Sequence, residues 1–187
     1  MEVNLPRKPT GSGRFARLEA WVAVFIALTS VAITLWEARA TREHDRMSVW
    51  PRLAQESSDS AGIFTRTITN VGLGPALVRS YALRVDGAPF RSWNAIVAAL
   101  LGPSQPVPGF YFSTVGPGTV ILPGKSIQVV TISGPKMSGL AMAQDHRLIG
   151  HLCYCSLYEE CWTVGSNEPN PTSVKACDHA DTTTVGR

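Results

Sequence analysis

The longest apolar run in the chain lies close to its N-terminus. Residues 20–36 (AWVAVFIALTSVAITLW) contain no charged side chain and would be apolar on every side of a helix. At about 1.5 Å of rise per residue, a helix over this run spans roughly 25 Å, close to the minimum for crossing a bilayer core. Trp21 and Trp36 stand at its ends, where indole rings favour the headgroup region. The pattern predicts a transmembrane helix over residues 18–36, with residues 20–36 in the lipid bilayer.

A cleaved secretory signal peptide is the main alternative for this run. Residues 38–40 (ARA) resemble a cleavage site, and four basic residues precede the run: Arg7, Lys8, Arg14 and Arg17. Apolar regions of signal peptides usually have about 7–15 residues, so the greater length favours an uncleaved signal-anchor. Three basic residues closely follow the run, against the four before it, and this small excess favours a cytoplasmic N-terminus. We therefore expect a single-pass protein of a bacterial inner membrane with its domain in the periplasm.

Composition and length predict the structure of the other segments. Residues 1–17 are polar and contain Pro and Gly, which predicts a disordered cytoplasmic tail. Residues 37–47 (EARATREHDRM) favour helix and predict a juxtamembrane linker that Pro51 ends. Residues 48–187 are enough for one domain with a core of its own.

Short apolar and alternating segments then indicate a mainly β domain. Residues 62–71 alternate between two faces, and residues 76–85 form a second predicted strand, which the turn dipeptide Asp86-Gly87 closes. Residues 119–122 and 126–132 predict a hairpin around Pro123-Gly124. Helical spacing predicts short helices over residues 92–101, with Ser92 as N-cap, and over residues 137–144. Residues 104–118 read as a loop rich in Pro and Gly.

The turn between the first two predicted strands carries a recognisable motif. Residues 70–76 (NVGLGPA) place Asn where it can bond the turn backbone and Gly where positive φ is tolerated. The string resembles the N-x-G-x-G-P-A pattern of bacterial membrane-anchored immunoglobulin-like β-sandwich domains, in which the motif is structural. The resemblance implies an immunoglobulin-like β-sandwich with short helical insertions, and it implies no activity.

All four cysteines lie near the C-terminus: Cys153, Cys155, Cys161 and Cys177. Residues 148–156 and 160–164 predict a hairpin, and a turn centred on Tyr158 would place Cys155 opposite Cys161 and Tyr154 opposite Trp162. Cys153 would then be left to pair with Cys177. Four cysteines allow three pairings, and we favour Cys155–Cys161 with Cys153–Cys177, which requires an oxidising compartment. The string C-Y-C-S-L-Y-x-x-C-W also resembles the terminal hairpin of proteobacterial single-span proteins with no assigned activity.

A metal site is the alternative use of these residues. His151, Cys153 and Cys155 share one face of the predicted strand, and Cys161, or Cys177 with His179 nearby, would complete four zinc ligands. Zinc prefers C-x₂₋₄-C spacing, and a C-x-C strand fits tetrahedral geometry less well. No C-x-x-C is present, although free or redox-active thiols stay open as a third reading.

Charge and motifs limit the classes of function. The net charge of +3 comes largely from the flanks of the apolar run, because seven of the seventeen basic residues precede Ser48. The domain is nearly neutral, and nothing indicates nucleic-acid binding. No catalytic motif is present, so we expect no enzyme and no cofactor, but a domain that binds or scaffolds a protein partner. The expected contact residues are aromatic: Phe110, Tyr111, Phe112 and Tyr158. A metal-binding or thiol-redox domain is the alternative function.

Overall fold

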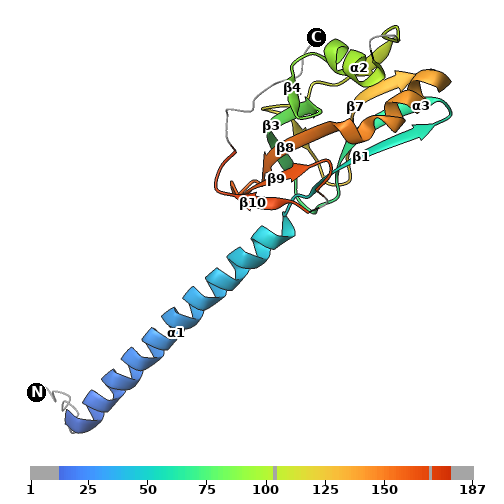
Figure 1. The fold of residues 1–187 in the computed structure, drawn as a ribbon. Coiled ribbons are helices and arrows are strands. Elements are labelled where there is room, and N and C mark those ends of the chain that lie inside the picture. Colours follow the sequence, from blue (N-terminus) through green and yellow to red (C-terminus); the bar gives the residue numbers. More distant parts are fainter. Residues whose placement is uncertain (1–12, 103–104, 169, 178–187) are drawn as a thin grey trace, which may run out of the picture. The chain divides into compact units, whose positions relative to one another are not determined.

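The protein is described by a computed structural model that covers residues 13–102, 105–168 and 170–177. The chain divides into two compact units between Asp45 and Arg46 (Figure 1). The helices of the described residues are α1 (Gly13–Ser48), α2 (Trp93–Leu101) and α3 (Pro135–Ala143), with a short 3₁₀ helix over Asp145–Arg147. The strands are β1 (Leu53–Ser60), β2 (Ile63–Asn70), β3 (Ala76–Val85), β4 (Ala88–Phe90), β5 (Phe110–Phe112), β6 (Val120–Ile121), β7 (Ser126–Ser133), β8 (Leu148–Cys155), β9 (Cys161–Gly165) and β10 (Thr172–Val174).

Helix α1 is long and apolar enough to cross a membrane, and its best 18-residue window has a mean hydropathy of 2.0. The hydroxyls of Thr29, Ser30 and Thr34 donate to carbonyl oxygens three or four residues earlier, which satisfies these polar groups inside the helix. The helix continues through residues 37–47, as predicted, and ends before Pro51. It also includes residues 13–17 of the segment predicted as a tail, whereas residues 1–12 lie outside the described residues.

The second unit consists of two antiparallel sheets. One sheet has the strand order β1-β2-β7-β5, and the other has the order β10-β9-β8-β3-β4, with β6 paired to β3. The predicted strands over residues 62–71 and 76–85 and both short helices are therefore confirmed. The mainly β class is confirmed as well.

The predicted hairpin over residues 119–132 is wrong. Strand β6 pairs with β3 in one sheet, while β7 pairs with β2 and β5 in the other, so the chain changes sheets between them. The backbone of Asn70 holds the connection between β6 and β7. Its carbonyl accepts from the Gly124 N–H at 2.8 Å, and its N–H donates to the Lys125 carbonyl at 3.0 Å. Two other expectations also need correction. The region 104–118 includes strand β5. Ser92 is the N-cap residue of α2, as predicted, but its side chain makes no capping hydrogen bond.

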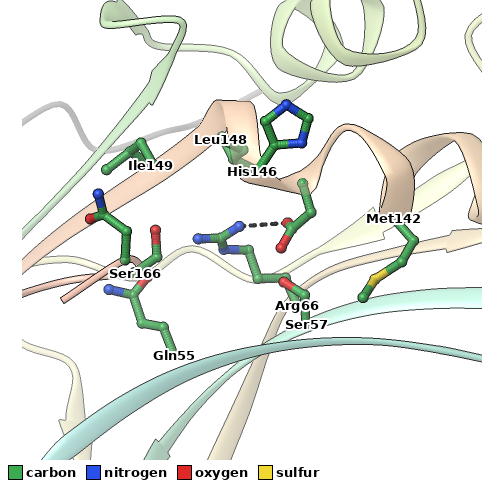
Figure 2. Close-up of a pocket in the computed structure, with 10 residues that line it drawn as sticks. Gln55, Ser57, Arg66, Met142, His146, Leu148, Ile149 and Ser166 are labelled. Carbon is green, nitrogen blue, oxygen red and sulfur yellow. Dashed lines mark hydrogen bonds and ion pairs between the residues drawn. The ribbon is translucent and has the colours of Figure 1, made fainter. Parts of the chain in front are cut away.

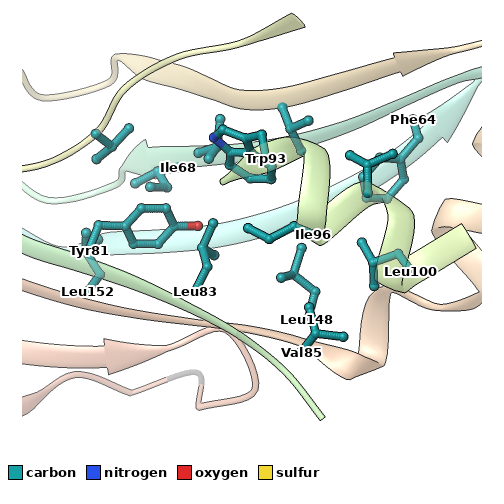
Figure 3. Packing of buried hydrophobic residues seen from close by; sticks show 14 of the residues in the cluster. Phe64, Ile68, Tyr81, Leu83, Val85, Trp93, Ile96, Leu100, Leu148 and Leu152 are labelled. Carbon is teal, nitrogen blue, oxygen red and sulfur yellow. The ribbon is translucent and has the colours of Figure 1, made fainter. Parts of the chain in front are cut away.

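One hydrophobic core joins the two sheets and the two short helices. Figure 3 shows Phe64 and Ile68 from β2, Leu83 from β3 and Leu152 from β8 in this cluster. Helix α2 adds its buried face, which consists of Trp93, Ile96, Val97, Leu100 and Leu101. Burial of one large apolar side chain contributes about 1.5–3 kcal/mol, so this shared cluster is the main force that holds the sheets together.

Two tight turns close hairpins with residues at positive φ. Ala61-Gly62 joins β1 to β2, and the predicted turn Asp86-Gly87 joins β3 to β4. The carboxylate of Asp86 accepts from the guanidinium Nε of Arg147 at 2.9 Å. This hydrogen bond holds the pKa of Asp86 below its usual range.

Candidate functional site

The motif at residues 70–76 holds residues 49–52 in place. These residues lead from α1 into the first strand of the second unit, the β unit, and we call them the entry segment. The N–H groups of Leu73 and Gly74 donate to the Trp50 carbonyl at 2.9 and 3.2 Å, and the Val71 N–H donates to the Arg52 carbonyl at 2.8 Å. Neither Gly72 nor Gly74 has positive φ, so the reason expected for these two glycines is wrong. A Cβ on Gly72 would collide with the backbone of residues 50–52, and one on Gly74 would collide with Val49. Both positions are glycine because another backbone lies directly against them.

Asn70 is the polar centre of this arrangement and is fully buried. Its side-chain amide donates to the carbonyls of Gly74 and Ile121, both at 2.8 Å, and its Oδ1 accepts from the N–H groups of Gly72 at 3.0 Å and Arg52 at 3.3 Å. One side chain therefore ties the entry segment, the turn and β6 to β2. The expectation that Asn bonds the turn backbone is confirmed, and the motif is structural.

Strands β8 and β9 form a hairpin that carries Cys153, Cys155 and Cys161, which we call the cysteine hairpin. It has the predicted register. Cys155 is opposite Cys161 and Tyr154 is opposite Trp162 in the pairing of β8 with β9. The rings of Tyr154 and Trp162 have centroids 6.0 Å apart, and Trp50 packs edge-on against Trp162 at 6.4 Å. Tyr154 is buried and its hydroxyl accepts from the Leu53 N–H at 3.3 Å; burial raises its pKa. The hairpin thus packs against the entry segment.

The structure joins the cysteines in the pairs that we favoured. Cys155 is bonded to Cys161 across the hairpin, with Cα atoms 4.0 Å apart, and Cys153 is bonded to Cys177, with Cα atoms 5.8 Å apart. The second bond holds the segment after β10 across the outer face of the sheet. The two bonds lie close together, because the sulfurs of Cys155 and Cys177 are 3.9 Å apart.

The predicted zinc ligands are not gathered as a set. The sulfurs of Cys155, Cys161 and Cys177 lie within 4.8 Å of one another, a group that leaves out both His151 and Cys153. His151 and Cys153 instead line a separate cavity with Ser80 and Thr163, and His179 lies outside the described residues. Zinc binds thiolate, so the three sulfurs would bind it only after both disulfides were reduced.

The predicted aromatic contact residues fall into two groups. Phe110 and Phe112 turn toward the core, and Phe112 packs near Trp93 with ring centroids 6.4 Å apart. Tyr111 points the other way and is 79% exposed, while Tyr158 is 49% exposed at the tip of the cysteine hairpin. Alternation along β5 therefore leaves Tyr111 as its exposed aromatic side chain, whereas Tyr158 lies in the turn between β8 and β9, two strands of the other sheet.

A polar cavity that we did not predict lies between β1, β2 and the start of β8. It has a volume of about 280 Å³, and Arg66 of β2 lies in its wall with only 2% of its surface exposed. Figure 2 shows the Arg66 guanidinium between Gln55 and Ser166 on one side and Met142 on the other. The alternation of β2 was a usable signal for this residue, because it places Arg66 on the same face as Phe64 and Ile68.

Arg66 takes part in a buried polar network. Its Nη1 donates to Asp145 Oδ1 at 2.7 Å, while its Nε is buried and has no hydrogen-bond partner among the described residues. Tyr81 lies near it, and burial raises the pKa of Tyr81, an effect that the Arg66 charge opposes. Gln55 extends the network to the other sheet, since its amide donates to the Gly150 carbonyl at 2.9 Å.

A second cavity continues along β1 from the first. It has a volume of about 370 Å³ and is lined by residues of β1 and by residues 164–168. Gln55, Ser166 and Asn167 line both cavities. We call the two together the β1 cleft. Glu56 and Glu168 line the second cavity, so two carboxylates lie on the wall of the cleft.

Comparison with known proteins adds no further assignment. No protein-family model and no curated protein matches this chain. Function must therefore be argued from the geometry of the β unit itself.

Proposed function

We propose that this chain is a single-span protein of the bacterial inner membrane whose β domain binds a protein partner in the periplasm without catalysing a reaction. The apolar helix α1 supports membrane attachment as a signal-anchor. The two disulfides support an oxidising compartment, because cytosolic thiols are normally kept reduced. The two antiparallel sheets with a shared core support an immunoglobulin-like β-sandwich, to which the resemblance at residues 70–76 pointed.

The observation that carries the proposal is the edge position of β1, which among the described strands pairs with β2 alone. This strand is the outermost strand of its sheet and has eight residues without Pro, Lys or Arg. Natural proteins protect an exposed edge with Pro or with charged side chains, above all Lys, because an edge pairs readily with another chain. The edge of β1 lacks Pro and Lys, and its charged side chains, Glu56 and Asp59, are both acidic, so beside the cleft it suits a partner segment with basic side chains that adds as an extra strand.

The hydrogen-bond pattern identifies the backbone groups that such a segment would meet. The Val71 N–H donates to the Arg52 carbonyl, and the register of β1 with β2 continues from this pair. Because hydrogen-bonded and non-bonded pairs alternate in an antiparallel ladder, the N–H and C=O groups of Gln55, Ser57 and Asp59 face away from β2. Gln55 and Ser57 also line the cleft.

Charge indicates the chemistry of the partner. The exposed side chains of Glu56 and Asp59 lie on β1, and Glu168 lies across the cleft. Arg66, which lines the cleft, is already paired with Asp145. The partner segment is therefore an extended polypeptide with basic side chains, placed opposite these carboxylates.

Photo-crosslinking tests this function in the full chain in its membrane. A photoreactive residue at the exposed position Ser58 is expected to form an adduct with another polypeptide. Ser57→Pro removes an N–H that faces away from β2, so it should abolish the adduct without breaking the β1–β2 ladder. Ser57→Ala is the matched control, because it keeps that N–H and should retain the adduct.

Two outcomes would contradict the edge-strand proposal. One is an adduct from Ser58 that survives Ser57→Pro in a folded protein. The other is an adduct from a photoreactive residue at Tyr111 with none from Ser58, which would place the contact at the aromatic strand β5 on the opposite edge of the sheet.

A further inference from the structure

The closeness of the two disulfides has a chemical consequence that is independent of partner binding. The sulfur of Cys155 is 3.9 Å from that of Cys177, although each is bonded to a different cysteine. This is close to the van der Waals separation of two sulfur atoms. A thiolate at Cys155 would therefore lie beside the Cys153–Cys177 bond with no need for the backbone to bring it there.

The surroundings favour such a thiolate. The three neighbouring sulfurs of Cys155, Cys161 and Cys177 line a cavity of about 260 Å³. Two basic side chains, Arg79 and Lys175, and one acidic side chain, Glu159, line it with them. Basic side chains near a cysteine lower its pKa and so increase the thiolate fraction. The cavity opens to solvent and Cys177 is only partly buried, so small thiols have access to the cluster.

We propose that this cluster is a disulfide-exchange site with two interchangeable pairings. A dithiol reductant first reduces Cys155–Cys161 to two thiols and is itself oxidised to a disulfide. The Cys155 thiolate then attacks Cys177 Sγ, a Cys155–Cys177 bond forms, and Cys153 leaves as a thiolate that takes up a proton. The exchange conserves the number of disulfides and moves the attachment of the C-terminal segment by two residues along β8, about 6.6 Å.

The substrate class is thus a dithiol, from either a protein or a small molecule. The site accepts two electrons and holds them as the free thiols of Cys153 and Cys161, while the partner of Cys177 changes from Cys153 to Cys155. Cys155 acts as the attacking group, Cys177 as the shared sulfur and Cys153 as the leaving group.

The Cys161→Ser variant of the full chain tests the exchange directly, because it leaves Cys155 as a free thiol. The protein, purified from membranes in detergent, is held at pH 8, quenched with acid, alkylated and cleaved after Tyr154, which separates Cys153 from Cys155. Mass spectrometry should find both Cys153–Cys177 and Cys155–Cys177. Each should account for about a tenth of the chains or more, which corresponds to pairings within about 1.4 kcal/mol of each other.

The control is Cys155→Ser/Cys161→Ser, which has no attacking thiol and should show Cys153–Cys177 alone. A Cys161→Ser protein that is folded, judged by its near-ultraviolet circular dichroism, and shows Cys153–Cys177 alone would overturn the proposal. If the variant fails to fold, limited reduction of the natural chain by dithiothreitol decides. Free Cys153 and Cys161 in the one-disulfide species would support exchange, and free Cys155 and Cys161 would refute it.

Discussion

Gly74→Ala is expected to lower the free energy of unfolding by at least about 3 kcal/mol, at the upper end of the effects of overpacking. The added Cβ would collide with backbone atoms of Val49, which do not move as a flexible side chain does. The entry segment would be displaced, with loss of the hydrogen bonds from Leu73 and Gly74 to the Trp50 carbonyl. Urea unfolding of the full chain in detergent, with the disulfides intact, measures the change.

The control is another glycine of the same unit. A Cβ on Gly139 of α3 meets no atom within 4 Å, and alanine favours helix by about 1 kcal/mol, so Gly139→Ala should be neutral or stabilising. If Gly74→Ala were as stable as Gly139→Ala, the entry segment would not be held against residues 70–76. Tryptophan fluorescence adds a local readout, since Trp50 packs against Trp162.

Asp145→Asn is the second change with a large expected effect. It leaves the Arg66 guanidinium, which is only 2% exposed, without its anionic partner. Breaking a buried ion pair by removal of one partner costs about 3–5 kcal/mol, and the 23% exposure of Asp145 points to the lower end of this range. Urea unfolding at neutral pH should therefore show a loss of about 3 kcal/mol.

A double variant separates the ion pair from its surroundings. Arg66→Met/Asp145→Asn removes the buried charge and keeps an apolar stem of similar length, so it should be more stable than Asp145→Asn alone. Equal stability of the single and the double variant would show that the charge of Arg66 is solvated in some other way, and this account of the polar cavity would then be wrong.

The cysteine hairpin was the part of the fold most open to prediction. Two constraints act on the same register: the Tyr154–Trp162 pair and the Cys155–Cys161 pair both require a turn centred on Tyr158. A slip of one residue would turn every side chain to the opposite face. Local sequence patterns of this kind are sufficient to predict a strand register where the paired residues are close in sequence.

Features that depend on distant contacts could not be predicted. Strand β1 was not predicted because its sequence is polar, although its partner β2 follows directly after a two-residue turn. The glycines at 72 and 74 were assigned to turn geometry, whereas their cause is a backbone segment about twenty residues earlier. The predicted hairpin over residues 119–132 failed for the same reason, since Asn70 holds the crossing between sheets.

The polar cavity illustrates a signal that was visible but not used. Arg66 occupies a buried position in the alternation of β2, and a charged residue there requires a partner. Its partner Asp145 lies in a 3₁₀ helix after α3, and no pattern in the sequence relates the two positions.

The thiol state of the protein in membranes tests the central claim, an exported β domain closed by two disulfides, most directly. Membranes are quenched in acid and denatured with a chelator present, and free thiols are alkylated before and after reduction. Intact mass should show no alkylation before reduction and four alkylated cysteines after it. Four alkylated cysteines before reduction would contradict the account, because the domain would then face a reducing compartment and the sulfurs of Cys155, Cys161 and Cys177 would be free to bind metal.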